Sequence, residues 1–345
     1  MRKDHLHLKA RRVDSYNKPF NFYISMREPG KSTVVLNRAI KEFRNKGRAS
    51  IILRRMVVDI TETYINDIET AINKFQTKEH KIKLEFKKGD IREGVVNVYI
   101  KGKLFLRVIA LSIPKSRFKS TVIRNPGIMI VDEFICDNRH GEKYLNDESG
   151  KFKEIYNTYQ RECNGYVLKV YFCGNPYSLF NPYFVWLGVD TSLLVEGALI
   201  VGSNYCIYCY RMKKELKELI LKRNPLYSIK DEYTEYAFNG KAVNDTNFQV
   251  VLKQPNGYYL RHVIRINNKY VGIYKNESSY WVTILKNTNR KVIAIDFNNL
   301  CENSNLITPS NRIILYALKD SISRRKVSYS SIEAGYLMEE IYYSI

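Results

Sequence analysis

The residues best suited to chemistry lie between positions 25 and 33, where the chain reads Ser-Met-Arg-Glu-Pro-Gly-Lys-Ser-Thr. An apolar stretch precedes this segment and apolar residues at helical spacing follow it, so the pattern predicts a strand, a loop and a helix. The N-terminus of such a helix faces phosphate groups. Gly30 lets backbone N–H groups turn toward an anion, Lys31 reaches the β- and γ-phosphates, and the Ser32 hydroxyl ligates Mg²⁺. The segment therefore predicts a phosphate-binding loop.

One position in this loop departs from the usual pattern G-x-x-x-x-G-K-[ST], because Ser25 stands where the first glycine belongs. Gly-Lys-Ser by itself also occurs in ordinary surface loops. The strand expected before it and the helix expected after it favour the phosphate-binding interpretation. The predicted nucleotide-binding residues are Ser25, Met26, Arg27, Glu28, Pro29, Gly30, Lys31, Ser32 and Thr33.

A second signal lies farther along the chain, where four apolar residues at 128–131 run directly into Asp132 and Glu133. A carboxylate at the carboxyl end of a parallel strand lies beside the ligand crevice. We expect Asp132 to hold Mg²⁺ through water and Glu133 to orient and deprotonate the attacking water. Strands often end in acids, but this pattern after the loop at 25–33 predicts an ATPase in which Lys31 and Glu133 are catalytic.

The next predicted strand, at 166–173, is followed by Asn175 and Pro176. A polar side chain at the tip of the strand after the acidic one suits contact with the γ-phosphate or its water, so Asn175 is a candidate catalytic sensor. The alternative is an Asx turn before the proline.

The charge balance indicates which class of partner the protein binds. Among 345 residues, 56 Lys and Arg oppose 35 Asp and Glu, for a net charge of +21. Such an excess indicates a polyanionic partner, either nucleic acid or an anionic membrane surface. No apolar run reaches the length of a membrane span, and the first residues lack the apolar core of a signal peptide. We therefore expect a cytosolic protein whose partner is nucleic acid. Cys206 and Cys209 have metal-ligand spacing, but no second pair accompanies them, so buried reduced thiols are expected.

The hydrophobic pattern predicts an α/β core with an antiparallel β insertion, because the period changes to two between 82 and 111. The expected elements are a buried strand at 49–55, a helix at 61–78, alternating strands at 82–86, 96–100 and 104–108, a helix at 151–163, and strands at 181–186 and 197–202.

Three parts are predicted: an ATPase domain at 1–210, a helical linker at 211–245 and a smaller α+β domain at 246–345. The linker begins with a charged amphipathic helix at 211–223, which Pro225 follows. In the last part, strands are expected near 248–253, 258–266, 269–275, 280–286 and 291–296, and helices near 311–324 and 330–343.

With both motifs in place, the chain resembles the DNA-packaging ATPases, or encapsidation proteins, of small short-tailed Picovirinae-type phages, which are relatives of large terminase subunits. The resemblance is good over about residues 20–210, whereas the C-terminal part resembles the family mostly in its size and position. The segments that carry it are Ser25 to Ser32, Ile51 to Arg55, Ile130 to Glu133, and Gly174 with Asn175.

The resemblance implies a P-loop NTPase core of the additional-strand catalytic glutamate type, with ATP and Mg²⁺ as cofactors and Ser32 and Asp132 as metal ligands. It implies a homomeric ring, expected to be a pentamer, at the portal vertex of a procapsid in the host cytoplasm. Such a ring drives double-stranded DNA inward by ATP hydrolysis. A packaging RNA is a further partner in relatives that use one, and no membrane partner is expected.

The resemblance also implies an arginine that acts on a neighbouring subunit, located on the helix between the acidic strand and the next one. Arg161 fits that place, where it would offset charge on the transferring phosphoryl group. The alternative is a surface arginine, and Lys119 and Arg124 are other candidates for the same role. Arg27 matches an arginine that these enzymes keep within the loop.

Large terminase subunits carry an RNase H-like nuclease, which needs several carboxylates around two metals. Here Asp296 is the one acid at a plausible strand end. We therefore expect a vestigial nuclease fold that binds nucleic acid. An active terminase nuclease and a non-motor P-loop switch that binds nucleic acid are the alternatives. The basic residues expected to serve this domain are Arg261, Arg265, Lys269, Arg290, Lys291, Arg324, Arg325 and Lys326.

Overall fold

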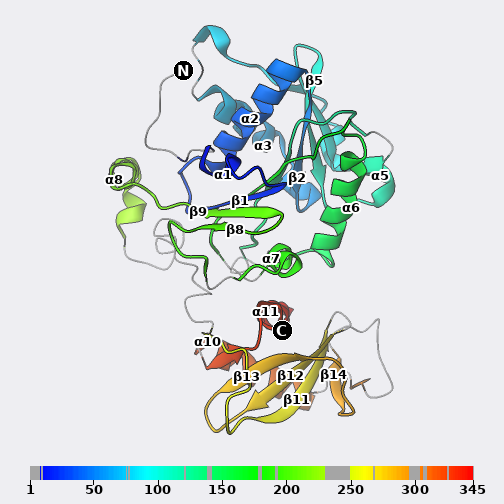
Figure 1. Ribbon diagram of the computed structural model, residues 1–345, viewed down its shortest axis with the longest axis vertical. Coiled ribbons are helices and arrows are strands. Elements are labelled where there is room, and N and C mark those ends of the chain that lie inside the picture. Colours follow the sequence, from blue (N-terminus) through cyan, green and yellow to red (C-terminus); the bar gives the residue numbers. More distant parts are fainter. Residues whose placement is uncertain are drawn as a thin grey trace. The chain divides into compact units, whose positions relative to one another are not determined.

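A computed structural model describes residues 8, 11–74, 76, 78–119, 122–137, 142–177, 181–190, 193–229, 249–266, 269–294, 304–305, 309–324 and 326–344. The chain divides into two compact units, which are described separately (Figure 1). The first unit comprises Met1–Cys136, Tyr144–Pro176 and Ser192–Lys241, and the second comprises Asp137–Lys143, Tyr177–Thr191 and Ala242–Ile345.

The described part of the first unit is built on a nine-stranded sheet in the order β3-β4-β5-β2-β6-β7-β1-β9-β8. The strands from β5 to β9 in this order run parallel to one another, whereas β3, β4 and β8 are antiparallel to their neighbours. The strands are β1 Phe20–Ile24, β2 Ser50–Arg54, β3 Glu85–Phe86, β4 Val95–Ile100, β5 Lys103–Ala110, β6 Met129–Asp132, β7 Val170–Gly174, β8 Leu199–Val201 and β9 Tyr205–Cys209.

Helices cover both faces of this sheet (Figure 1). Arg38 on α2 lies over the ring of Tyr171 on β7, whereas Phe152 on α6 packs against Phe172, the next residue of β7. Because successive side chains of a strand point to opposite faces, α2 and α6 cover opposite faces. The helices are α1 Arg11–Asp14, α2 Lys31–Lys46, α3 Glu62–Asn73, α4 Asp90–Glu93, α5 Lys115–Lys119, α6 Glu148–Gln160 and α8 Lys214–Arg223, with 3₁₀ turns η1 Val57–Asp59, η2 Lys78–His80 and η5 Pro225–Ser228.

Aromatic residues form the core between the sheet and α6. Phe22 of β1 stacks on Phe172 of β7 with ring centroids 4.2 Å apart. Phe134 contacts both rings, and Phe152 of α6 contacts Phe172. All four side chains are buried. Each such side chain removes a large apolar area from water, so this cluster holds β1, β7 and α6 together.

Several predicted elements of this unit are confirmed, with shifted ends. Helix α2 begins after Gly30 and ends at Gly47, both in the left-handed conformation. The helix expected at 61–78 stops at Asn73. The strand expected at 104–108 extends over 103–110, and it pairs parallel with β2 as well as antiparallel with β4. The antiparallel insertion therefore consists of β3 and β4 added to a strand of the parallel core. Cys206 and Cys209 are buried free thiols.

The prediction of a strand at 181–186 is wrong, because these residues form helix α7 Pro182–Leu187. The Asn181 side chain accepts hydrogen bonds from the N–H groups of Tyr183 and Phe184, at 3.1 and 3.0 Å. Pro182 occupies the first helical position, where its missing N–H costs nothing. This cap overrides the strand preference of the aromatic run Tyr-Phe-Val-Trp.

The second unit carries a seven-stranded sheet in the order β10-β16-β13-β12-β11-β14-β15 among its described residues. Strands β11, β12 and β13 form an antiparallel meander, and β14 pairs parallel with β11. Ile264, Val271 and Val282 of the meander pack with Leu315 and Leu337 of two helices in a buried core. The elements are β10 Gln249–Val250, β11 Tyr259–Ile266, β12 Lys269–Lys275, β13 Tyr280–Leu285, β14 Val292–Ala294, β15 Ser304–Asn305, α10 Pro309–Ser323, β16 Val327–Tyr329 and α11 Ile332–Ser344.

The unit boundaries differ from the predicted domains in three places. Asp137–Lys143 group with the second unit although they fall within 1–210. Residues 177–191, including α7, group with the second unit rather than with the rest of 1–210, and α7 contacts α11. The helix expected at 211–223 begins at Lys214 and groups with the first unit. Residues 230–248 of the predicted linker and its surroundings lie outside the described residues. None of the described helices has the length and apolar character to span a membrane.

Replacing Asn181 tests the α7 cap. Because Asn181 is fully buried, Asn181→Ala leaves two backbone N–H groups without their acceptor and should lower the free energy of unfolding by about 1–2 kcal/mol. Urea denaturation of the whole chain measures the change. Asn181→Asp keeps the acceptor oxygen and should lose less; equal losses for both variants would contradict a capping role.

Candidate active site

The polar residues of the two predicted motifs meet at one edge of the first unit's sheet. Strands β1, β7, β6 and β2 are hydrogen-bonded neighbours that run parallel, so their carboxyl ends lie at the same edge. The chain reaches this edge at Ser25, Asn175, Asp132 and Arg54. Ligands of open parallel sheets bind beyond the carboxyl ends of the strands. The predicted loop and acids therefore lie where a ligand would bind.

The Lys31 amine is buried at this edge and bonded to three oxygens. It donates to the backbone carbonyls of Ser25 and Met26, at 2.8 and 2.9 Å, and to Oδ1 of Asn175 at 2.8 Å. Burial lowers the pKa of Lys31 to about 8, and the negative charge of Asp132 opposes that shift. Lys31 and Asn175, which the sequence singles out separately, are thus direct partners.

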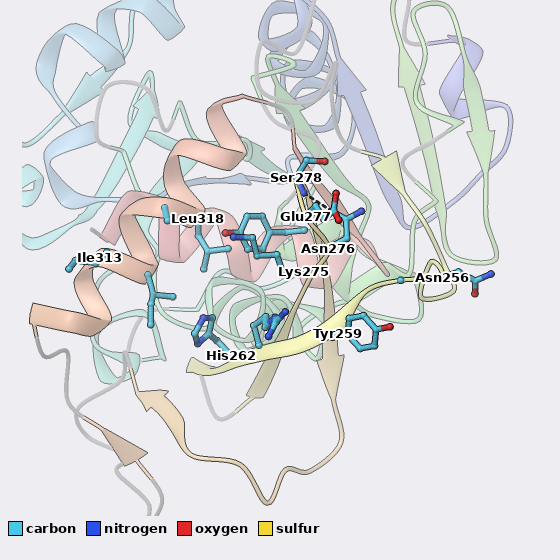
Figure 2. A pocket seen from close by; sticks show the side chains of 14 residues that line it. Asn256, Tyr259, His262, Lys275, Asn276, Glu277, Ser278, Ile313 and Leu318 are labelled. Carbon is cyan, nitrogen blue, oxygen red and sulfur yellow. Dashed lines mark hydrogen bonds between the residues drawn. The ribbon is translucent and has the colours of Figure 1, made fainter.

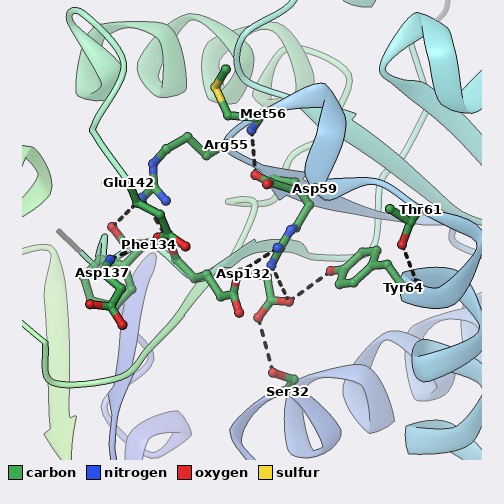
Figure 3. A network of polar contacts seen from close by, with 12 residues as sticks. Ser32, Arg55, Met56, Asp59, Thr61, Tyr64, Asp132, Phe134, Asp137 and Glu142 are labelled. Carbon is green, nitrogen blue, oxygen red and sulfur yellow. Dashed lines mark hydrogen bonds and ion pairs between the residues drawn. The ribbon is translucent and has the colours of Figure 1, made fainter. Parts of the chain in front are cut away.

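Asp132 accepts hydrogen bonds on both carboxylate oxygens (Figure 3). Its Oδ1 lies 3.2 Å from the Ser32 hydroxyl, and its Oδ2 lies 3.0 Å from the Tyr64 hydroxyl and 3.4 Å from Nη1 of Arg54. Burial, together with the negative charge of Asp132, raises the pKa of Tyr64 well above its ordinary value, so the phenol stays a donor. A hydroxyl and a carboxylate side by side are the hard oxygen donors that Mg²⁺ prefers. Ser32 and Asp132 therefore fit the predicted metal ligands.

Glu133 lies next to Asp132 but in a different environment. Its backbone is left-handed, with φ of 55°, which is uncommon for a residue with a Cβ atom. One carboxylate oxygen lies 2.7 Å from Nη2 of Arg54, and the Glu133 side chain is 59% exposed whereas that of Arg54 is 11% exposed. The Arg54 guanidinium also lies over the Tyr64 ring, 4.7 Å from its centroid. Arg54 thus links the two acids.

The loop between β1 and α2 has the backbone of a phosphate-binding turn. Glu28 and Gly30 are left-handed, with φ of 79° and 87°. Ser25 does not adopt a positive φ, so this position does not require the glycine of the usual pattern. Met26 and Pro29 are buried, Thr33 is half-buried, and the side chains of Arg27 and Glu28 are exposed. The outer part of the loop therefore faces away from the core.

Comparison with known proteins gives the family of the chain. The family model described as Podovirus DNA encapsidation protein (Gp16) matches residues 1–337. The chain belongs to this encapsidation protein family. A DNA packaging protein of Bacillus phage B103 is 30% identical over 178 residues, which are 51% of this chain and 50% of that protein. The match thus spans about half the length of this curated relative.

Two solved structures share the fold along nearly the whole chain. The bacteriophage Phi-29 viral genome packaging motor assembly is similar with a TM-score of 0.64 and 20% identity, covering 98% of this chain and 99% of that chain. The Phi-28 gp11 DNA packaging motor is similar with a TM-score of 0.60 and 16% identity, covering 98% and 97%. The fold of this encapsidation protein is therefore that of packaging motor subunits.

Arg161 lies apart from these residues. It ends α6 and is exposed, and its neighbours Gln160 and Glu162 bond to Tyr166 and Asn125, which precede β7 and β6. Arg161 is therefore at the opposite edge of the sheet from Lys31 in the same chain. Arg124 is exposed at that edge too. Lys119 is the last residue of α5.

Arg54 and Tyr64 both contact Asp132, although the sequence motifs predict no role for either residue. The position of Arg54 could have been inferred, because a residue at the carboxyl end of a parallel strand reaches the same edge as Asp132. Tyr64 gives no such signal, since it belongs to the apolar pattern of α3 and only the packing of α3 brings its hydroxyl to the acid.

The basic residues predicted for the second unit have several different partners. Arg290 donates to the Leu260 carbonyl at 2.8 Å, Arg324 pairs with Asp320 at 3.0 Å, and Lys269 pairs with Glu333. Arg265 lies over the ring of Tyr270. Lys291 and Lys326 are exposed. Arg325 and the acidic candidate Asp296 lie outside the described residues.

Arg261 instead lines a pocket of about 860 Å³ beside α10 (Figure 2). His262 and Lys275 add basic groups, and Tyr259 adds an exposed aromatic ring. Across the described residues of the chain, no three His, Cys, Asp or Glu side chains are grouped to hold a metal.

The lowered pKa of Lys31 predicts proton uptake on nucleotide binding. In the free protein the amine is charged below about pH 8 and neutral above it; bound phosphates favour the charged form and raise that pKa. Binding of Mg²⁺-ATP at pH 8 should therefore take up about half a proton, and affinity should fall as pH rises further. Calorimetry in buffers of different ionisation enthalpy measures the uptake. At about pH 6.5, where Lys31 is already charged, this uptake should vanish; an equal uptake at both values would refute the assignment.

Proposed function

We propose that this encapsidation protein hydrolyses ATP and uses the energy to move double-stranded DNA into a procapsid as a homomeric ring. One observation supports the hydrolysis above all: Ser32 and Asp132 lie 3.2 Å apart, beside the left-handed loop at Gly30 and next to Glu133. A phosphate-binding helix N-terminus, a metal-ligating hydroxyl and two acids at one sheet edge are the parts that ATP hydrolysis requires.

The residues have distinct roles in this proposal. Backbone N–H groups of the loop from Ser25 to Thr33 bind the phosphates, with Lys31 at the β- and γ-phosphates. Ser32 and Asp132 hold Mg²⁺, which neutralises developing phosphate charge when bound. Asn175 exchanges its hydrogen bond with Lys31 for a contact with the γ-phosphate or with the attacking water. Glu133 orients the attacking water and takes its proton, which requires its carboxylate to leave Arg54.

The order of the strands supports the additional-strand class of P-loop NTPase. β7 lies between β1, which leads into the phosphate loop, and β6, which ends in the two acids. The interposed strand leaves room for a water-activating glutamate after the metal-binding aspartate, and Glu133 occupies that position.

The proposed partners follow from family membership, fold and charge. A net charge of +21 suits a protein that grips the phosphates of duplex DNA. The structures with this fold are described as packaging motors, which supports action at the portal vertex of a procapsid in the host cytoplasm. We propose a pentameric ring, and a packaging RNA as a further partner in the manner of relatives that use one.

We propose the domain limits 1–210, 211–245 and 246–345, with the last domain a vestigial nuclease that binds nucleic acid. Its antiparallel meander, extended by parallel β14 and β15 next to β11, supports an RNase H-like ancestry. The described strands of the meander and β14 carry no acid, which supports binding rather than cleavage. Arg261 and Lys275 at the pocket are candidate phosphate contacts.

The first test is the ATPase rate of the wild type and of Glu133→Gln, each with and without linear double-stranded DNA. The wild type should hydrolyse faster with DNA, and Glu133→Gln should lose about 10²-fold or more because its amide cannot accept the water proton. Both should bind ATP equally, as measured by fluorescence titration. Wild-type hydrolysis that ignores DNA would favour a nucleotide-controlled switch, and released DNA fragments would favour an active nuclease.

The second test addresses Arg161, which cannot reach Lys31 of its own chain. Arg161→Ala should keep ATP affinity and lose DNA-stimulated hydrolysis by about 10³-fold. Mixed with Glu133→Gln subunits, it should recover part of the activity, because each variant supplies the group that the other lacks. Arg124→Ala tests the alternative candidate at the same edge and should keep DNA-stimulated hydrolysis if Arg161 is the acting residue. A mixture as inactive as its components, or normal hydrolysis by Arg161→Ala, would reject action between subunits.

A further inference from the structure

The backbone of Glu133 is held by a buried arginine that the mechanism above does not use. Nη2 of Arg55 donates to the carbonyl oxygens of Glu133 and Phe134, at 3.1 and 3.2 Å. Its Nε donates to Oε2 of Glu148, the first residue of α6, at 2.9 Å. The guanidinium also lies over the ring of Tyr144, 5.1 Å from its centroid. We propose that Arg55 is a positioning residue that fixes the catalytic glutamate for water activation, an inference that rests on the proposed ATPase activity.

Glu133 is left-handed, a conformation that a residue with a Cβ atom keeps only when its surroundings enforce it. The chain on its other side is also bonded, because the Phe134 N–H donates to the Cys173 carbonyl at 3.2 Å. Arg55 therefore supplies the donors that hold Glu133 and Phe134 from the carbonyl side, while β7 holds Phe134 from the amide side.

Arg55 is 8% exposed and Glu148 is 1% exposed, so neither charge can exchange its partner for water without a large desolvation cost. The Glu148 carboxylate is held in turn, since Oε2 also accepts from the Leu145 N–H at 2.9 Å. A charge pair this enclosed is a fixed anchor, whereas the exposed carboxylate of Glu133 is free to change partners.

A guanidinium donates in several directions from one plane, and Arg55 uses this to bond two carbonyls and a carboxylate at once. A lysine keeps the charge but is a single point donor on a flexible stem. Arg55→Lys should therefore pair with Glu148 and lose at least one of the two carbonyl contacts.

The anchor also joins two functional parts. Glu148 opens α6 and Arg161 ends it, so Arg55 ties the loop of one catalytic site to the helix that presents an arginine at the other edge of the sheet. A shift of the Glu133 backbone would move the first turn of α6.

The test compares Arg55→Lys with Arg107→Lys, a matched buried arginine on β5 that is 6% exposed and bonds Asn97. Arg55→Lys should lower kcat about 10- to 100-fold, because a small misplacement of a catalytic group costs that much, while KM and ATP affinity stay near wild type. Arg107→Lys should leave kcat within about twofold. The double variant Arg55→Met with Glu148→Leu removes both charges. It should recover the stability that is lost when only one of the two charges is removed, yet its kcat should stay low.

A readout without hydrolysis separates this inference from the proposed activity. Hydrogen exchange of peptides that cover residues 133–137 should be at least tenfold faster in Arg55→Lys and in the double variant than in the wild type, and unchanged in Arg107→Lys. If exchange is faster in Arg55→Lys than in the wild type, but the wild type itself has no ATPase activity, the anchor is kept and the proposed function is rejected. Unchanged exchange, or a kcat restored together with stability in the double variant, would overturn the positioning role.

Discussion

The position of β7 between β1 and β6 is the constraint on which the active site depends. Parallel pairing sets Ile24 opposite Gly174 and Asp132 opposite Cys173, so the phosphate loop, Asn175 and the two acids leave the sheet side by side. A shift of β7 by one residue would turn all its side chains to the other face and remove Phe172 from its stack on Phe22. The aromatic core that stabilises the sheet therefore also brings Asn175 within reach of Lys31.

In the structure, each charged group of this site has polar partners from the protein itself. Lys31 contacts two backbone carbonyls and Asn175, Asp132 contacts Ser32 and Tyr64, and Glu133 contacts Arg54. In the proposed reaction, phosphate and metal take the place of these partners, so much of the cost of desolvating the charges is met when the protein folds. On ligand binding, oxygens of the ligand replace oxygens of the protein around donors that are already in place. Electrostatic preorganisation requires this arrangement.

The sequence was sufficient to predict those parts of the site that belong to one local pattern. Gly30, Lys31 and Ser32 follow a strand and open a helix, and Asp132 and Glu133 end an apolar run; the structure brings them together as the α/β pattern predicts. The partners that come from other elements could not be predicted from the sequence. Tyr64 reaches Asp132 only through the packing of α3, and Glu148 reaches Arg55 only through the start of α6. Local capping by Asn181 also outweighed the strand preference of the residues that follow it.

Strand alternation explains how two consecutive arginines serve the same site in different ways. Arg54 and Arg55 leave the end of β2 on opposite faces, as successive residues of a strand do. Arg54 turns toward α3 and contacts Tyr64 and the acidic side chains, whereas Arg55 turns toward α6 and contacts Glu148 and the backbone after β6. One strand end thus ties both helical layers to Glu133, one through its carboxylate and the other through its carbonyl. The partly exposed contact between Arg54 and the Glu133 carboxylate is the one that changes. The buried contact between Arg55 and the Glu133 carbonyl keeps the backbone in place during that change.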